Sequence, residues 1–227
     1  MSVKDFVQQR RDALIAMRRD FHMYPEPAWL EYRSAAKVAD RLISLGYDVA
    51  LGADVLDLES RMGLPSDEVM KAAMDRAIKE GANPELVEKM SYGKTAIVAT
   101  MNFGGEGPVV AFRVDMDSND VIEAKEDNHV PTKGGFRSCH DKAMHACGHD
   151  AHMTMGLGLA EYLATHKDEF KGTIKLIFQP AEEGVRGAKA MAEAGVVDDV
   201  DLMFGMHIGF NEKLSNCFAC SDHGSLA

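Results

Sequence analysis

The 227-residue chain is 46% hydrophobic and 27% charged, with a formal net charge of -11. This composition is typical of a soluble globular protein, and the acidic excess argues against nucleic-acid binding, which depends on a basic surface. No apolar run approaches the roughly 20 residues that cross a bilayer, and residues 1–20 are too charged for a signal peptide. Four cysteines in a chain of this size do not resemble a disulfide framework, so we expect a reduced, cytoplasmic protein without a membrane partner.

The N-terminus predicts a long amphipathic helix. Ser2 followed by Asp5 is typical of a capping box. Apolar residues then recur at helical spacing: Phe6, Val7, Leu14, Met17 and Phe21. The two prolines within residues 24–27 end this helix.

A second helix is expected at residues 32–45, ending at Gly46, and a short strand at 47–51. The pattern then changes over about residues 53–92, where Ser66 begins a further helix. We expect this segment to be an inserted helical hairpin on the surface, with no catalytic residue pattern of its own.

The second half of the chain alternates strands and helices. Strands are expected at residues 95–101, 108–114, 173–178 and 202–206, and helices at 149–165 and 188–194. Residues 118–143 are polar with weak periodicity, which indicates a long functional loop. The alternation predicts an α/β fold with a mostly parallel sheet and helices on both faces.

Residues capable of chemistry follow the predicted strands. Asp115 and Asp117 follow one strand, Glu182 and Glu183 a second, and His207 a third, while Cys147 and His149 lead into a helix. Ligands of open α/β sheets bind beyond the carboxyl ends of the strands. If the sheet is parallel, these residues converge on one crevice.

The stretch from 144 to 152, Met-His-Ala-Cys-Gly-His-Asp-Ala-His, is the richest in metal-binding groups. Cys147 and His149 point the same way from an extended backbone, and Gly148 lets the chain bend, so both could bind one ion. The alternative is a polar helix start that Asp150 caps. His145 and His152 are expected to support the ligands or to contact substrate.

The other candidates also have two interpretations. Of the adjacent Glu182 and Glu183, one could ligate an ion while the other reaches a bound water; alternatively they form a solvated acidic turn before a helix. Asp115 and Asp117 could hold an imidazole N–H or steady a ligand, or they could be a polar strand end. His207 could instead be a hydrogen-bonded core histidine.

The remaining histidines and the C-terminal cysteines are not expected in the site. We expect surface positions for five histidines: His22, His129, His140, His166 and His223. Cys217 and Cys220 form a C-x-x-C pair without a second such pair, and we interpret them as incidental rather than as a zinc or redox motif.

These motifs resemble the M20 metallopeptidases, specifically the amidohydrolase (M20D) branch that cleaves N-acyl amino acids. The matching stretches are residues 19–26, 113–117, 144–152, 179–184 and 206–209. They occur in the right order over nearly the whole chain. The insert and residues 134–136 further resemble the p-aminobenzoyl-glutamate hydrolases, in particular their A subunits.

The resemblance implies a zinc-peptidase-like catalytic domain that hydrolyses an amide bond of an N-acyl or aminobenzoyl amino acid. Cys147 would bridge two metal ions, with His149, Glu183 and His207 as further ligands. Glu182 would be the general base. The ions would be Mn²⁺ or Zn²⁺, since the thiolate favours zinc while carboxylate and imidazole suit either.

The chain departs from this family in length. Family members are close to twice as long, with a lid domain that mediates dimerisation and a later return of the chain that supplies a last metal-binding histidine. We therefore expect residues 1–227 to be the N-terminal portion of a catalytic domain, with the lid missing and the site incomplete. The family implies a dimer or A/B hetero-oligomer, which the missing lid puts in doubt. The alternative function is a non-catalytic metal-binding or interaction remnant.

Overall fold

The computed structural model describes residues 1–209 and contains a five-stranded sheet with the order β1-β2-β4-β3-β5. The strands are β1 (Asp48–Leu51), β2 (Ile97–Asn102), β3 (Val109–Asp115), β4 (Thr173–Gln179) and β5 (Leu202–Gly205). Strand β3 pairs in parallel with β4 and β5, whereas β1–β2 and β2–β4 are antiparallel. The predicted α/β class is confirmed, but the sheet is mixed rather than mostly parallel. Because β4 lies between β2 and β3, the link of residues 103–108, which contains three glycines, does not form a hairpin between β2 and β3.

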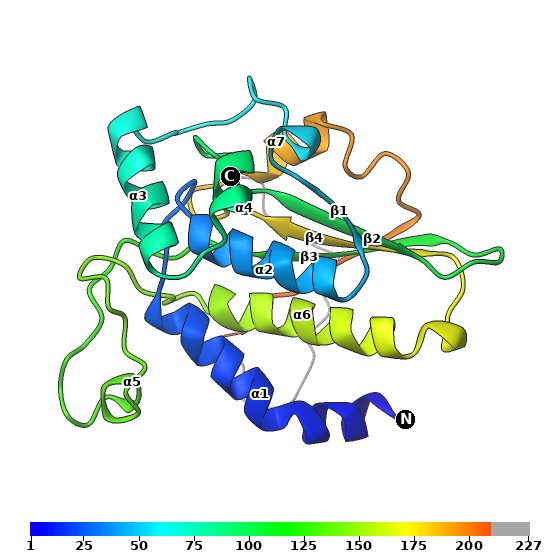
Figure 1. Cartoon of the computed structure of the whole chain (residues 1–227), viewed down its shortest axis with the longest axis horizontal. Coiled ribbons are helices and arrows are strands. Elements are labelled where there is room, and N and C mark those ends of the chain that lie inside the picture. The colour runs from blue at the N-terminus through cyan, green and yellow to red at the C-terminus, as the bar shows by residue number, and fades with distance from the viewer. Residues whose placement is uncertain (210–227) are drawn as a thin grey trace.

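Helices cover both faces of the sheet, as predicted. The long helices α1 (Val3–Met23), α2 (Tyr32–Ser44) and α6 (His149–Thr165) form a layer on one face (Figure 1). The short helix α7 (Ala188–Glu193) packs on the other face. Neighbouring strand residues point to opposite sides, so Phe178 joins the core under the long helices while Ile177 packs with Met191 of α7.

The remaining helices lie in the insert and the loops. The insert contains the 3₁₀ turn η1 (Gly52–Val55), α3 (Asp67–Lys79) and α4 (Pro84–Lys89). The long loop contains α5 (Val130–Lys133), and η2 (Lys167–Glu169) precedes β4.

Local signals explain several helix ends. The Ser2 hydroxyl accepts a hydrogen bond from the Asp5 backbone N–H at 3.2 Å, and Ser66 caps α3 in the same way. Gly46 has φ +81°, the left-handed conformation that follows a helix end. Of the apolar residues that recur at helical spacing in α1, Phe6 and Phe21 are buried, whereas Val7 is 47% exposed.

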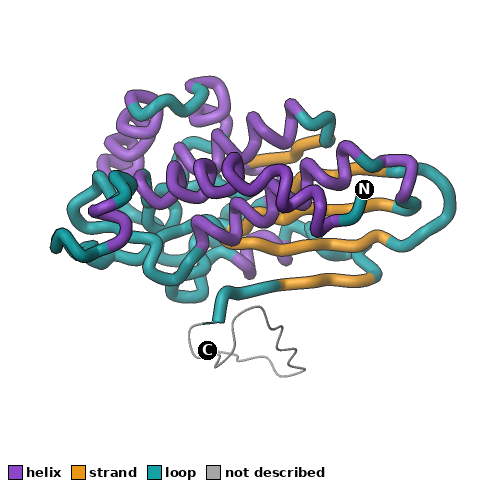
Figure 2. Tube along the Cα trace, turned by 90° about the horizontal axis from the view of Figure 1, so that it is seen from below, coloured by secondary structure: helices purple, strands orange, loops and turns teal. Residues whose placement is uncertain are grey.

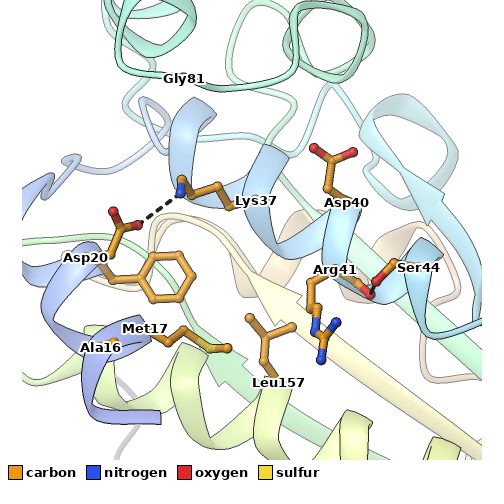
Figure 3. A pocket seen from close by; sticks show the side chains of 10 residues that line it. Ala16, Met17, Asp20, Lys37, Asp40, Arg41, Ser44, Gly81 and Leu157 are labelled. Carbon is orange, nitrogen blue, oxygen red and sulfur yellow. Dashed lines mark hydrogen bonds and ion pairs between the residues drawn. The ribbon is translucent and has the colours of Figure 1, made fainter. Parts of the chain in front are cut away.

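The helical layer has a surface hollow between α1, α2 and α6 (Figure 3). Met17 and Leu157 contribute apolar surface, and Asp20 forms a 3.2 Å ion pair with Lys37 at its edge. None of the predicted site residues lines this hollow. Within residues 1–209 no helix has the length and apolarity needed to span a membrane.

Strand β5 forms one edge of the described sheet (Figure 2). Leu202, Met203 and Phe204 are each 52% exposed, and the Phe204 ring stacks on Phe112 with centroids 5.3 Å apart. An edge strand presents unpaired backbone groups, so β5 is a surface on which a further strand can pair.

Candidate metal centre

The predicted site residues lie at the carboxyl ends of β3, β4 and β5. These are the strands that run parallel to one another, so their carboxyl ends share one edge of the sheet. The antiparallel strands β1 and β2 lie on the far side of β4 and do not disturb this edge. The sequence predicted that these residues converge if the sheet is parallel, and the three strands that carry them are parallel.

Cys147 and His207 are brought together from distant parts of the chain. Cys147 Sγ lies 3.3 Å from His207 Nε2. The His207 Nδ1–H donates to the Ile208 carbonyl at 2.8 Å, which leaves the Nε2 lone pair facing the thiol. His207 is exposed, so the alternative of a core histidine is wrong. The Cys147 backbone N–H donates to Asn119 Oδ1 at 3.0 Å, a support that no sequence pattern indicated.

His149 lies at the centre of the cluster and is fully buried. Its Nδ1–H donates to the Asp117 carbonyl at 2.8 Å, so Nε2 points toward the carboxylates. Glu182 Oε2 is 3.8 Å from this nitrogen and Glu183 Oε1 is 3.9 Å from it. Burial alone would lower the pKa of His149, but the hydrogen bond to Asp117 and the charge of Asp115 raise it.

Gly148 lies between the two candidate ligands and directly precedes α6. Its φ of +91° is in the left-handed region, and a Cβ there would lie 3.4 Å from Ile208 Cδ1. Gly148 occupies the N-cap position and has no side chain to cap the helix, while the Asp150 carboxylate accepts one first-turn N–H, that of Ala151, at 2.8 Å. The left-handed residue reorients the chain between Cys147 and His149.

The turn that presents Glu182 and Glu183 is anchored by a buried carboxylate. Asp117 accepts the backbone N–H of Glu182 at 3.0 Å and that of Glu183 at 2.9 Å. Glu31 accepts the Ala181 N–H at 2.8 Å, and its burial together with the Asp117 charge raises the pKa of Glu31 to about 8. No sequence pattern pointed to Glu31, which precedes Ala181 by 150 residues.

Asp115 holds His152 in one orientation. The His152 Nδ1–H donates to Asp115 Oδ1 at 2.6 Å, and His152 Nε2 accepts the Ile208 N–H at 3.0 Å. Arg113 forms a 2.8 Å ion pair with the other Asp115 oxygen. Burial would raise the pKa of Asp115, but the His152 hydrogen bond and nearby positive charges lower it. His152 thus connects β3 to the segment that follows β5.

His145 differs from the other histidines of the site. It is buried, and neither ring nitrogen has a hydrogen-bond partner within the described part of the chain. Burial lowers the pKa of His145 to about 4, so its ring is neutral at physiological pH.

The prediction that His22 is a surface residue is wrong. Its ring is 2% exposed and lies between Asp150, at 2.7 Å from Nδ1, and Glu123, at 3.0 Å from Nε2. His129, His140 and His166 are half-buried. His223, Cys217 and Cys220 lie outside the described residues.

The chemistry of the cluster fits divalent metal ions. His149 Nε2 and Glu183 Oε1 are buried and make no hydrogen bond within residues 1–209. Two candidate ligand groups share His149, one with Cys147 and His207 and the other with Glu182 and Glu183. Burial and the nearby glutamates raise the pKa of the Cys147 thiol to about 12, so a thiolate requires a cation beside it. Thiolate, imidazole and carboxylate are the donor types that zinc takes in proteins.

A third ligand-like group, Asp115, His149 and His152, also lies here. Because Asp115 and His152 are already hydrogen-bonded to each other, we interpret this pair as a structural support of the site and not as metal ligands.

Comparison with known proteins agrees with this geometry. The model of peptidase family M20/M25/M40 matches residues 111–220. The chain is 49% identical, over 98% of its own length, to the A subunit of p-aminobenzoyl-glutamate hydrolase from Escherichia coli K12. The chain belongs to the M20 peptidase family. It is also 48% identical, over 97% of its length, to the indole-3-acetyl-aspartic acid hydrolase of Enterobacter agglomerans.

Solved structures of M20 proteins share the fold. The aminobenzoyl-glutamate utilization protein of Klebsiella pneumoniae superposes with a TM-score of 0.79 at 42% identity, covering 93% of this chain and 47% of that one. A dinuclear metal-binding M20 peptidase of Bacillus subtilis superposes with a TM-score of 0.64 at 30% identity, covering 92% and 45%. The resemblance to the A subunits of p-aminobenzoyl-glutamate hydrolases is thus confirmed. This M20 chain spans about half the length of the curated relatives it matches, 51% of each of the two named above.

Proposed function

We propose that this M20 chain belongs to a metal-dependent amide hydrolase that cleaves N-acyl or aminobenzoyl amino acids. The observation that carries the proposal is the convergence of Cys147, His149, Glu182, Glu183 and His207 at one sheet edge. Within that cluster, His149 Nε2 and Glu183 Oε1 are buried without hydrogen-bond partners among residues 1–209. A purely structural polar cluster would leave few such atoms unsatisfied.

The substrate class follows from the relatives. Both named hydrolases act on conjugates of dicarboxylic amino acids, glutamate in one and aspartic acid in the other. We therefore propose a p-aminobenzoyl-glutamate-like substrate, an N-acyl amino acid with a carboxylate on its side chain. The Escherichia coli relative is named as one subunit of its enzyme, which supports assembly as a hetero-oligomer.

We assign the metal ions to four side chains, Cys147, His149, Glu183 and His207, and propose two ions of Mn²⁺ or Zn²⁺. The chemistry that divalent ions supply when bound is Lewis acidity, which lowers the pKa of a nearby water. Asp117 orients His149 through the carbonyl and orients the glutamate turn through the carboxylate.

Glu182 is the residue placed to move the proton. Its side chain is one-third exposed, so water and substrate reach it, and Oε2 faces His149. Burial and the negative charge of Asp115 raise the pKa of Glu182. A base whose pKa lies nearer neutrality also returns its proton readily. Glu182 accepts a proton from the attacking water and donates it to the nitrogen of the leaving amino acid.

The test combines metal content with turnover. Protein purified without chelator is analysed for metals and assayed with p-aminobenzoyl-L-glutamate, beside Glu182→Gln, Glu183→Gln and the exposed control Glu106→Gln. We expect about two ions per chain, and a loss of roughly 10²–10⁴-fold in turnover for Glu182→Gln at unchanged metal content. Glu183→Gln is expected to lose metal as well, whereas Glu106→Gln behaves as wild type.

Two results would count against this proposal. Metal binding without turnover in the wild type would favour the alternative of a non-catalytic metal-binding domain. Absence of metal binding would exclude both the metal-dependent hydrolase and the non-catalytic metal-binding domain.

A further inference from the structure

The turn that presents the two glutamates also carries a cation, Arg186. Its Nε–H donates to the Glu183 carbonyl at 3.1 Å, and Nη1 donates to the Gly63 carbonyl at 3.4 Å. The side chain is half-buried, and across residues 1–209 it forms no ion pair with a carboxylate. Both of these contacts of the guanidinium are to neutral carbonyl groups, so it has no carboxylate partner among residues 1–209.

Two glycines make room for this side chain. Gly63 has φ +66° and Gly184 has φ +82°, and a Cβ at either position would lie 2.9 Å from an Arg186 side-chain atom. Glycine thus serves both the left-handed backbone and the close approach at each point. Because Gly63 lies in the insert and Gly184 in the glutamate turn, the guanidinium is clamped between two separate segments.

The backbone of this turn is strained in a way that fixes Arg186. Val185 has φ +58°, which is rare for a β-branched residue. The turn closes through hydrogen bonds from the Arg186 and Gly187 N–H groups to the Ala181 carbonyl, at 3.1 and 2.9 Å. Such strain persists only where surrounding contacts over-determine it, and it gathers at functional sites.

The charge around Arg186 defines what it can bind. Four carboxylates, Asp115, Asp117, Glu182 and Glu183, make the crevice acidic. The other nearby guanidinium, Arg113, is already bound to Asp115 and Gln179, each at 2.8 Å. The Arg186 Nε–H bonds directly to the Glu183 carbonyl, so the guanidinium lies beside a residue that is assigned to the metal ions.

We propose that Arg186 binds the side-chain carboxylate of the dicarboxylic amino acid in the substrate and so determines specificity. This inference rests on the proposed function, because it assigns a residue to the second carboxylate of the substrate class named there. A guanidinium presents parallel N–H donors that match a carboxylate, and the remaining Nη donors of Arg186 supply that contact.

The test compares two ligands that differ only in this charge. Binding of p-aminobenzoyl-L-glutamate and p-aminobenzoyl-L-glutamine to Zn²⁺-loaded protein is measured by calorimetry for the wild type, Arg186→Gln and Arg186→Lys. We expect the wild type to bind the glutamate conjugate at least tenfold more tightly. Arg186→Gln is expected to lose that preference while binding the glutamine conjugate as the wild type does, and Arg186→Lys to restore part of it. Arg11→Gln, an exposed arginine of α1, is the control.

The outcomes separate this inference from the function beneath it. A wild type that binds both conjugates equally, or an Arg186→Gln variant that keeps the preference, overturns the role of Arg186 and leaves the amide hydrolase standing. Unchanged metal content in Arg186→Gln shows that the glutamate turn is intact. A wild type that neither binds nor hydrolyses either conjugate overturns the proposed function, and the specificity role with it.

Discussion

Replacing His22 with alanine is expected to destabilise the fold by about 3 kcal/mol. The ring bridges two carboxylates that are themselves buried, Asp150 and Glu123, which are 0% and 1% exposed. These contacts join α1 to the first turn of α6 and to the long loop. The substitution leaves both carboxylates without their shared cation inside the protein.

The size of the expected loss in stability depends on the contacts that Asp150 and Glu123 keep after the substitution. Loss of one partner from a buried ion pair costs about 3–5 kcal/mol. Arg18 still pairs with Asp150 at 2.9 Å, and Glu123 keeps the Ser138 N–H, so the lower end of that range applies. For a chain of this length, about 3 kcal/mol corresponds to a fall in Tm of roughly 6–12 °C.

The effect should depend on pH. Burial would lower the pKa of His22, but its hydrogen bonds to Asp150 and Glu123 raise it above the ordinary value. The folded state therefore binds the proton more tightly than the unfolded state. The stability that His22 contributes is complete below its unfolded pKa of about 6.5 and declines as pH rises through the folded pKa.

Urea unfolding followed by circular dichroism at pH 6 and pH 9 measures both quantities. The difference between wild type and His22→Ala should be larger at pH 6. Gln8→Ala, an exposed change on the same helix, should stay within about 0.5 kcal/mol of wild type. A loss below 1 kcal/mol at pH 6, or an equal loss at both pH values, would refute the reasoning.

Three further substitutions test other features. Gly148→Ala should lower the free energy of unfolding by about 1–2 kcal/mol, because the φ of Gly148 is +91°. It should also reduce the metal content measured by elemental analysis. An unchanged Tm together with an unchanged metal content would contradict the role of this glycine. Val185→Gly should raise Tm by about 2 °C, because glycine adopts the left-handed conformation without strain and the 58%-exposed valine side chain makes little packing contact. A lower Tm in thermal melts would show that the valine backbone was not strained. Met203→Lys on the β5 edge should lower concentration-dependent association in light scattering, and equal association would show that this edge is not the contact.

Much of the fold follows from local patterns. The predicted helix at 149–165 coincides with α6, and the predicted strand at 173–178 lies within β4. These segments carry strong periodicity and clear end signals, which depend on neighbours in sequence. The direction of β2 could not be predicted in this way, because it is set by pairing with β4, more than seventy residues later in the chain.

For the candidate site, too, local sequence predicted which residues take part, and the tertiary structure decided whether they meet. Cys147, His149, Glu182, Glu183 and His207 could be predicted because each follows a strand or begins a helix, and the residue types suit metal chemistry. Their convergence required three parallel strands, and the structure has them.

The sequence by itself determined the family, the secondary structure and the donor atoms of the candidate metal centre, because motifs and periodicity are local properties. Only the tertiary structure decided which residues support that centre. His22 meets Asp150 across 128 residues, and Glu31 meets Ala181 across 150. The clamp of Gly63 on Arg186 spans 123 residues. Burial turns such distant polar residues into partners, because a charge removed from water must find a partner inside the protein.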